Sequence, residues 1–415
     1  MKTEIKQRIE QIRRGEVPER YVKTALGLAP ANWKRYTFGD IYTERKKPGD
    51  ENLPLLMVSI HSGVSDGEVD AAELPKQVKR IEDKSQYKKA VSGDLVFNMM
   101  RAWQGAIGTA RTTGMVSPAY IVAEPNDKAY PLFMDYYSRT PQMINQIDRQ
   151  SYGVTDFRKR LYWDSFAPIS CTLPPIEEQQ KIATILTTQD RVIELKEKQL
   201  AEKQRQKKYL MQQLLTGKKR LPGFNGAWKT DCLGKLFFER KETNCENIEM
   251  LAITGTQGII PRKELDLKDN SSEDKSKYLR VCVGDIGYNT MRMWQGVSAY
   301  SNYEGIVSPA YTILKPSSSI NAKYFAYLFK MSEIVFLFYR FSQGLVDDTR
   351  NLKYENFKKI KVCYPPDMKE QTAIAEVLSA ADREIDLLRQ DIEQEKQKKK
   401  ALMQLLLTGI VRVKI

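Results

Sequence analysis

Two long segments of the chain carry apolar residues at alternating spacings of four and three, the period of a coiled-coil helix. They lie within 174–217 and 365–409. Each begins with a pair of prolines, has acidic residues in its first turn and ends at a glycine, and these signals are typical of helix ends. The apolar seam is predicted to comprise Ile182, Leu186, Ile193, Leu200, Ile374, Leu378, Ile385, Leu388 and Ile392.

A helix of ~40 residues is ~60 Å long at ~1.5 Å per residue, and one such helix cannot bury its apolar seam alone. We therefore predict that the two helices pack against each other. Polar residues also occupy the seam, for example Gln189, Lys196, Glu395 and Lys399. These polar layers are expected to weaken the pairing near the basic ends of the helices.

The rest of the chain mixes two patterns. Short apolar or alternating runs, typical of strands, lie at 53–60, 94–100, 118–123 and 309–314. Segments with broad apolar faces, typical of helices, lie at 131–147 and 322–341. The fold class is therefore predicted as α+β, with two α/β globules and two long helices.

An internal repeat explains this organisation. The octapeptide NMMRAWQG at 98–105 recurs as NTMRMWQG at 289–296, and VSPAY follows both copies. Residues 5–15 also resemble the end of each long helix. The predicted domains are an N-terminal helical segment that completes a circular repeat (1–29), a globule (30–172), a long helix (173–217), a second globule (218–364) and a second long helix (365–415).

Charge and cysteine content narrow the function classes. The 66 Lys and Arg against 52 Asp and Glu leave a net charge of +14, which favours a polyanionic partner such as nucleic acid or a membrane surface. No apolar run approaches the ~18–20 residues of a membrane span, and the N-terminus lacks a signal-peptide pattern, so we expect a cytoplasmic protein. The five cysteines form no C-x-x-C pair, and neither disulfides nor a metal site is expected.

Catalytic motifs are missing from the sequence. His61 is the single histidine, and neither a phosphate-binding P-loop nor a G-x-G-x-x-G turn is present. Asp190, Glu194 and Lys196 weakly resemble the active-site residues of a nuclease. Charges at such spacings on a long helix are more simply interpreted as its solvent-exposed face. We expect no catalytic residue and no cofactor bound by this chain.

The octapeptides have three possible roles: scaffold, phosphate contact and base reading. If the two globules read different half-sites, shared residues cannot supply the difference, so scaffold is favoured over phosphate contact, and base reading is least favoured. His61, which stands opposite Thr256 of the second copy, could read a base, although a surface or capping histidine is the simpler interpretation. The candidate DNA-binding residues are Asn98, Arg101, Gln104, Asn289, Arg292 and Gln295 in the octapeptides, and His61, Lys79, Arg80, Arg158, Lys159, Arg160, Arg280 and Arg350 outside them.

Taken together, these motifs resemble a known family. The segments LPPIEEQQKIATIL and PPDMKEQTAIAEVL, the helix ends KKYLMQQLLTG and KKALMQLLLTG, and the pattern GD-x-x-x-N-x-M-R followed by G-x-V-S-P-A-Y are similar to the conserved regions and target-recognition domains of type I restriction–modification specificity subunits.

The resemblance implies a non-catalytic reader of double-stranded DNA. Each target-recognition domain would bind one half of a bipartite, asymmetric site, and an antiparallel helix pair would hold the halves roughly one turn, ~10 bp, apart. Two methyltransferase subunits that bind S-adenosylmethionine would dock on the helices and flip an adenine in each half-site for N6 methylation. Motor–nuclease subunits that use ATP and Mg²⁺ would complete the restriction complex.

Two other function classes stay open at this point. One is a nuclease or methyltransferase with unrecognised motifs, which would turn over labelled S-adenosylmethionine or plasmid DNA as a purified chain. The other is a stand-alone nucleic-acid-binding scaffold. Neighbouring genes for a methyltransferase and a helicase-like nuclease would favour the specificity subunit over both.

Overall fold

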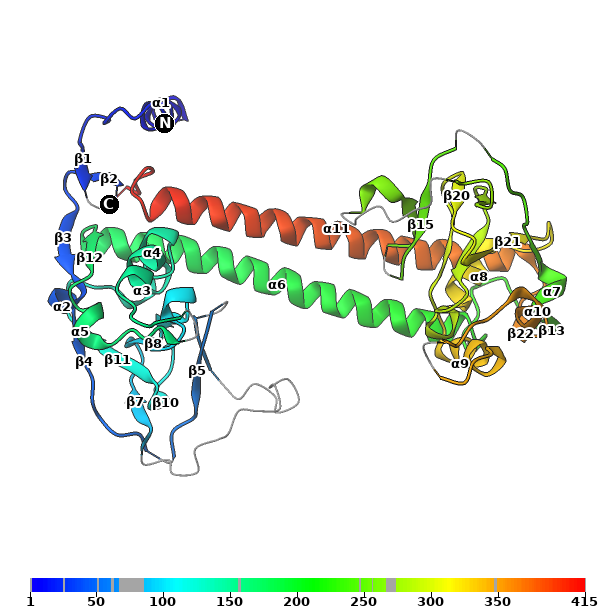
Figure 1. Cartoon of the computed structure of the whole chain (residues 1–415), viewed down its shortest axis with the longest axis horizontal. Helices are drawn as coiled ribbons and strands as arrows, with labels where there is room; N and C mark the ends of the chain where they lie inside the picture. Colours follow the sequence, from blue (N-terminus) through cyan, green and yellow to red (C-terminus); the bar gives the residue numbers. More distant parts are fainter. Residues whose placement is uncertain are drawn as a thin grey trace. The chain divides into compact units, whose positions relative to one another are not determined.

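The computed structural model of the chain describes residues 2–24, 27–50, 52–60, 63–66, 86–155, 158–245, 248–255, 257–265, 274–346 and 349–414 (Figure 1). Contacts within the chain divide it into two units. Unit 1 comprises Met1–Leu195 and Ile392–Ile415, and unit 2 comprises Lys196–Asp391. The division cuts both long helices, so each unit contains a part of both.

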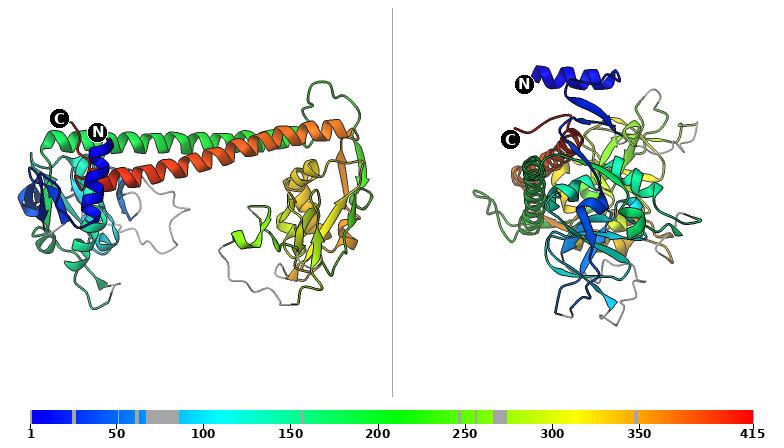
Figure 2. Two further views of the ribbon diagram at one scale, coloured as in Figure 1. Left: turned by 90° about the horizontal axis from the view of Figure 1, so that it is seen from above. Right: turned by 90° about the vertical axis from the view of Figure 1, so that its left-hand side faces the viewer.

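The long helices are α6 (Ile176–Leu214) and α11 (Met368–Leu406), each of 39 residues, and both run without interruption (Figures 1 and 2). Gly217 and Gly409, the glycines that follow them, both have φ of +70°. That left-handed conformation suits a helix C-terminal cap and favours glycine. The predicted helices and their glycine stops are confirmed.

Within each unit the two long helices pair antiparallel. The cross-helix contacts show this, because residue numbers rise along one helix as they fall along the other. Polar seam residues form the cross-helix contacts. In unit 1, Gln189 Nε2 donates to Glu395 Oε2 (2.7 Å) and Lys399 Nζ lies 2.5 Å from Asp190 Oδ1. In unit 2, the ion pairs are Lys196–Asp391 (2.6 Å), Lys203–Glu384 (2.6 Å) and Lys207–Asp382.

These contacts change the expected weakness of the polar layers. The seam lysines meet carboxylates of the opposite helix, so their charges are compensated in the pair. Since the pairs are partly exposed, each contributes only ~0–1 kcal/mol, and their main effect is to remove the cost of burying part of a lysine. Complementary charges also favour one register of the helices over others.

The apolar seam is shared with the globules. All the predicted seam residues are buried except Leu200 and Leu388, which are half-buried. Ile182 and Leu186 belong to the core of unit 1, and Ile374 and Leu378 belong to the core of unit 2. The start of each long helix is therefore covered by its own globule as well as by the other helix.

Each globule contains a four-stranded antiparallel sheet of the same order. In unit 1 the order is β4 (Tyr42–Glu44), β11 (Tyr120–Pro125), β8 (Leu95–Asn98) and β9 (Ile107–Thr109). In unit 2 it is β14 (Phe237–Glu239), β21 (Tyr311–Pro316), β18 (Ile286–Asn289) and β19 (Ser298–Tyr300). The register also agrees, since Tyr120 pairs with Asn98 and Tyr311 with Asn289.

Each unit also contains two-stranded antiparallel pairs. In unit 1 they are β1 (Tyr21–Thr24) with β2 (Gly27–Pro30), β3 (Lys34–Thr37) with β12 (Ser170–Leu173), β5 (Leu56–Ser59) with β6 (Gly63–Asp66), and β7 (Lys88–Ala90) with β10 (Gly114–Val116). In unit 2 they are β13 (Lys229–Cys232) with β22 (Lys361–Tyr364), β15 (Leu251–Ile253) with β16 (Ile259–Pro261), and β17 (Leu279–Val281) with β20 (Gly305–Val307).

The remaining helices of the two units are short. In unit 1 they are α1 (Lys2–Arg13), α2 (Phe38–Ile41), η2 (Ala102–Gln104), α3 (Pro131–Tyr137), α4 (Pro141–Arg149) and α5 (Trp163–Phe166). In unit 2 they are α7 (Leu233–Leu236), η4 (Arg262–Glu264), η5 (Met293–Gln295), α8 (Ala322–Leu328), α9 (Ser332–Phe341) and α10 (Tyr354–Phe357).

The segments 131–147 and 322–341 each form two helices where the sequence pattern predicts one. In unit 1, the Thr140 hydroxyl accepts a hydrogen bond from the Met143 amide and Pro141 begins α4, so a new helix starts there. In unit 2, Met331 has an extended backbone before α9. The apolar face continues across both breaks, which is why periodicity alone does not reveal them.

Each globule has a core rich in aromatic side chains. Phe97 and Phe166 pack with ring centroids 4.7 Å apart in unit 1, and Phe237 and Phe325 lie 5.3 Å apart in unit 2. All five cysteines are free thiols, and burial raises the pKa of Cys171 to about 12. Across the described ranges, no helix combines the length and apolar character needed to span a membrane.

Candidate nucleic-acid interface

Each octapeptide forms the same rigid turn between two strands of its sheet. The first joins β8 to β9 through η2, and the second joins β18 to β19 through η5. Gly105 and Gly296 end these turns at φ of +104° and +79°, where any other residue would be strained. The repeated glycine is thus explained by backbone geometry.

Side chains inside the octapeptide hold the turn together. Asn98 Oδ1 accepts a hydrogen bond from the Met100 amide (2.9 Å), and Trp103 Nε1 donates to the Met100 carbonyl (3.1 Å). The second copy repeats both contacts, from the Met291 amide to Asn289 Oδ1 (3.0 Å) and from Trp294 Nε1 to the Met291 carbonyl (2.8 Å). Asparagine and tryptophan are therefore framework residues.

The remaining polar residues of the motif face outward. Arg101 and Gln104 are exposed, as are Arg292 and Gln295 in the second copy. Within the described parts of the chain, neither arginine forms an ion pair. A guanidinium held on a rigid turn, with no internal carboxylate, is suited to contact a phosphate.

A second segment is attached to this turn in both units. The Leu161 amide donates to the Met99 carbonyl (2.9 Å), and the Leu352 amide donates to the Thr290 carbonyl (2.8 Å). These contacts bring three predicted cations, Arg158, Lys159 and Arg160, to the octapeptide of unit 1, and Arg350 to that of unit 2.

One cation of this segment in each unit stacks on an aromatic ring. Lys159 Nζ lies 4.9 Å from the Trp103 ring centroid and 2.7 Å from Asp148 Oδ1. The Arg350 guanidinium carbon lies 4.1 Å from the ring centroid of Tyr339, which packs edge-on against Trp294. In both units, a cation stacked on an aromatic ring therefore lies beside the octapeptide turn.

Other predicted residues are placed elsewhere. Arg280 lies on β17, where its Nη2 is 2.6 Å from Glu304 Oε1 and its Nη1 is 3.2 Å from Glu242 Oε2. Hydrogen bonding to Glu304 raises the pKa of this guanidinium further. His61, Lys79 and Arg80 lie outside the described residues.

Two dipeptides that recur in both copies, Glu-Arg and Gly-Asp, supply the partners of a buried ion pair. This pair was not predicted from the sequence. Arg45 Nε and Nη2 lie 2.6 and 3.1 Å from the two carboxylate oxygens of Asp94, and Arg240 and Asp285 repeat the arrangement at 2.8 and 3.1 Å. Both aspartates are almost fully buried. Their recurrence with the octapeptide was the available signal, and their role is to support the sheet that carries it.

A tyrosine–aspartate–lysine network ties each globule to both long helices. In unit 1, the Tyr136 hydroxyl donates to Asp190 Oδ2 (2.6 Å), and Lys399 pairs with the same carboxylate (2.5 Å). In unit 2, the Tyr327 hydroxyl donates to Asp382 Oδ2 (2.7 Å), and Lys207 pairs with Asp382. Burial, followed by the neighbouring aspartate, raises the pKa of Tyr136.

The nuclease-like set on α6 is divided among separate contacts. Asp190 binds Tyr136 and Lys399, Glu194 pairs with Arg191 at 2.8 Å, and Lys196 pairs with Asp391 at 2.6 Å. Such contacts are structural. In the part of the chain that the structure describes, no three His, Cys, Asp or Glu side chains gather as a metal site.

The repeated Glu-Gln dipeptide at the start of each long helix joins further segments. Arg412 binds Glu178 in unit 1 (2.6 and 2.7 Å), and Arg220 binds Glu370 in unit 2 (2.5 and 2.7 Å). The adjacent glutamines accept hydrogen bonds from the Tyr130 and Asn321 amides, each at 2.8 Å. The chain's C-terminal tail thus makes the contact in unit 1 that residue 220 makes in unit 2.

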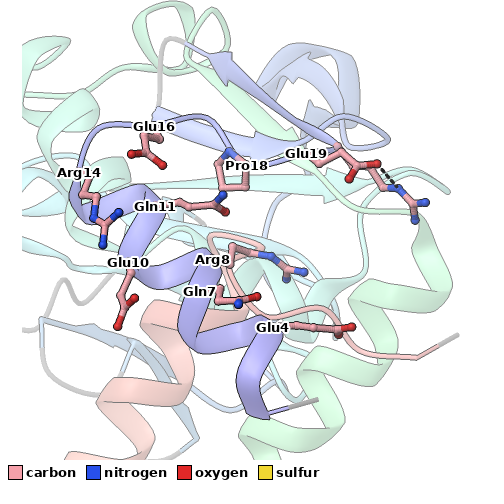
Figure 3. Close-up of a pocket in the computed structure, with 10 residues that line it drawn as sticks. Glu4, Gln7, Arg8, Glu10, Gln11, Arg14, Glu16, Pro18 and Glu19 are labelled. Atoms are coloured by element: carbon pink, nitrogen blue, oxygen red, sulfur yellow. Dashed lines mark ion pairs between the residues drawn. The ribbon is translucent and has the colours of Figure 1, made fainter.

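A large open hollow of about 660 Å³ lies between α1 and residues 14–20 of unit 1 (Figure 3). Charged side chains of both signs line it, including Glu4, Arg8, Glu10 and Arg14. None of the candidate DNA-binding residues lines this hollow. Its mixed charges give it no preference for a polyanion.

Known proteins are similar to this chain along most of its length. The family model described as the type I restriction modification DNA specificity domain matches residues 77–205 and 234–397. The putative type I restriction enzyme MjaX specificity subunit of Methanocaldococcus jannaschii is 24% identical over 95% of this chain and 97% of its own, and the MjaVIII specificity subunit of the same organism is 25% identical over the same shares. The S subunit of a type I restriction–modification system from M. genitalium shares the fold, with a TM-score of 0.55, 13% identity and coverage of 90% of this chain and 96% of that one.

Proposed function

This chain belongs to the type I restriction modification DNA specificity family, and on that premise we propose that each of its units reads one half of a bipartite, asymmetric DNA site. Its role is that of a non-catalytic specificity subunit in a restriction–modification complex. The proposed target-recognition domains are residues 30–172 and 218–364. The segments 1–29, 173–217 and 365–415 would supply the helical frame in a pseudo-twofold arrangement.

One observation carries the proposal. In both units an octapeptide turn, held by its own asparagine and tryptophan, presents an exposed arginine and glutamine beside a cationic segment. Because these exposed residues are the same in both copies, they suit contacts to phosphate and sugar, which carry no sequence information. We assign this role to Arg101, Gln104, Arg292 and Gln295, with Arg158, Lys159, Arg160 and Arg350 beside them.

Base reading falls to segments that differ between the copies, 59–90 and 254–281. His61, Lys79 and Arg80 are the candidates in the first. Arg280 is the candidate in the second, although DNA would have to displace its two glutamate partners. Asn98 and Asn289 are assigned to the framework, because their side-chain oxygens are already used within the turn.

The complex would complete the chemistry. Two methyltransferase subunits carrying S-adenosylmethionine would dock along the long helices and methylate one adenine at N6 in each half-site. Motor–nuclease subunits with ATP and Mg²⁺ would add restriction. The helix pair would set the spacing between the halves, and the assembly would act in the cytoplasm, where it meets the chromosome.

A domain exchange tests the division of labour. Residues 30–172 are replaced by the same region of a related subunit, and the host's N6-methyladenine pattern is read by long-read sequencing. One half of the methylated site is expected to change, while the other half and the spacing stay the same. Simultaneous change of both halves contradicts independent domains, and a purified chain that alone methylates or cleaves plasmid contradicts a non-catalytic subunit.

A further inference from the structure

Unit 2 contains an open cavity of about 520 Å³ between the β15–β16 hairpin, β19, α8 and the two long helices. Four cations and two carboxylates line it: Lys207, Lys323, Lys330, Arg389, Asp382 and Asp386. The excess of positive side chains makes this cavity attractive to an anion.

The two carboxylates are already engaged. Asp382 pairs with Lys207 and accepts a hydrogen bond from the Tyr327 hydroxyl, and Asp386 lies 3.3 Å from Arg389. Lys323 and Lys330 are left without a carboxylate among the residues that the structure describes. The surplus charge of the cavity therefore sits on these two lysines.

Lys330 is held in place by backbone carbonyls. Its Nζ donates to the carbonyls of Gly296 (2.7 Å) and Ser298 (2.6 Å), which leaves one of the three ammonium protons. Although the side chain reaches solvent, close packing and the charge of Lys207 lower its pKa to about 8. Gly296 is the last residue of the second octapeptide, so the lysine connects the cavity to that turn.

One residue that lines the cavity has a buried hydroxyl without a partner among the described residues. Ser298 is 1% exposed and lines the cavity, yet its Oγ forms no hydrogen bond with any described residue. Buried hydroxyls are normally paired, because an unpaired one loses its bonds to water. The corresponding residue of the first repeat is Ile107, which has no such requirement.

Unit 1 shows what is missing. At the repeat offset of 191, Ala326 corresponds to Asp135, Lys330 to Arg139 and Asn302 to Arg111. Asp135 is almost fully buried, and its carboxylate lies 2.6 Å from Arg111 and 3.3 Å from Arg139. Unit 2 retains a cation at the position of Arg139, but a methyl group replaces the carboxylate.

We propose that the unit 2 cavity binds a phosphate group, whose oxygens occupy the place that the Asp135 carboxylate fills in unit 1 and accept hydrogen bonds from Lys330, Lys323 and Ser298. The phosphate belongs either to the backbone of bound DNA or to a free phosphate compound. In the first case the site rests on the proposed function, because it adds a backbone contact beside the second octapeptide. If the phosphate belongs to a free phosphate compound, the site does not depend on the proposed function.

The first experiment measures thermal unfolding of the full chain with inorganic phosphate. Phosphate at about ten times its Kd is expected to raise the melting temperature by roughly 2–5 °C. A326D supplies the carboxylate of unit 1 internally and is expected to lose this response, as is the double variant K323Q/K330Q. K359Q, which removes an exposed lysine outside the cavity, is the matched control and should respond like the parent chain.

The second experiment measures duplex DNA binding at several salt concentrations. If the phosphate comes from DNA, A326D and K323Q/K330Q lower the affinity and reduce the slope of log K against log salt by about one for each lost contact, whereas K359Q does not. The inference is overturned if both variants behave like the parent chain in the phosphate experiment and also in the DNA-binding experiment. A chain that responds to inorganic phosphate through this cavity but binds no DNA would contradict the proposed function alone.

Discussion

Asn98 and Arg101 lie three positions apart in the first octapeptide, but their surroundings separate their roles. Asn98 is buried and bonded to the turn, whereas Arg101 is exposed. In the second copy, Asn289 is half-buried and is also bonded to the turn, whereas Arg292 is exposed. Residues of this motif therefore recur for two physical reasons. Some maintain the backbone geometry of the turn, and others present a cation to the solvent.

Substitutions of Asn98 and Arg101 are expected to affect different properties, the stability of the protein for Asn98 and its DNA binding for Arg101. N98A removes the acceptor for the Met100 amide and should lower the free energy of unfolding by about 1–2 kcal/mol. R101A should change it by less than about 0.5 kcal/mol while weakening DNA binding similarly across sequences. Urea unfolding and DNA binding distinguish the two. A base-specific loss in R101A would show that Arg101 reads sequence.

The buried Arg45–Asp94 pair provides a second test at this scale. D94A leaves a guanidinium with an 8% exposed side chain without its bidentate partner, and we expect a loss of about 3–5 kcal/mol in the free energy of unfolding. Glu124 also contacts Arg45 but is mostly exposed, so E124Q should cost no more than about 1 kcal/mol. Equal losses in the two variants would mean that burial does not determine the cost.

The long helices act as elements through a few side chains that cross between segments. Tyr136 on α3, Asp190 on α6 and Lys399 on α11 join three elements at one carboxylate. Tyr327, Asp382 and Lys207 do the same in unit 2. Each globule is thereby fixed to both helices of its own unit.

This network is expected to show coupling. In a double-mutant cycle of Y136F and D190N, the interaction free energy should be about 0.5–3 kcal/mol, because removal of either partner abolishes the same hydrogen bond. The exposed pair Arg191–Glu194 supplies the control cycle, for which about 0.3–0.5 kcal/mol is expected. Additive effects of Y136F and D190N would exclude a structural role for their contact.

The C-terminal tail is expected to stabilise unit 1 through one residue. R412M leaves the fully buried Glu178 without its cation, and unfolding should become easier by about 3–5 kcal/mol. R20M alters an arginine that is almost fully exposed and should have little effect. Chemical denaturation measures both. A wild-type midpoint for R412M would mean that the tail does not support the start of α6.

For the whole molecule, the proposed function makes the helix pair a determinant of DNA spacing. Insertion of about four residues, roughly one helical turn, into both α6 and α11 lengthens the pair by ~6 Å. That length corresponds to one or two base pairs at ~3.4 Å per step. Sequencing of N6-methyladenine should show a longer gap between unchanged half-sites. An unchanged gap would mean that another part of the complex sets the spacing.

Local features of this protein could be predicted because neighbouring residues encode them. The period of Ile374, Leu378 and Ile385 specifies a helix with one apolar face, and the glycines after each helix specify its end. The repeat implied two globules of one kind, and the structure has two sheets of identical strand order. These are statements about short spacings or about similarity, and neither requires knowledge of distant contacts.

Other features depend on partners far away in the sequence. Lys196 and Lys207 look like defects in an apolar seam until Asp391 and Asp382 are found opposite them. Asp190 looks like a nuclease carboxylate until Tyr136 and Lys399 are seen to bind it.

The sequence by itself therefore determined the repeated architecture, the long helices and the octapeptides as the motif to examine. Only the tertiary structure decided which octapeptide residues face solvent, and that Asp135 binds Arg111 and Arg139 in unit 1 whereas Ala326 lines an open cavity in unit 2. The reason is that periodicity records which residues are apolar, whereas the role of a polar side chain depends on the groups that folding brings within about 3 Å of it.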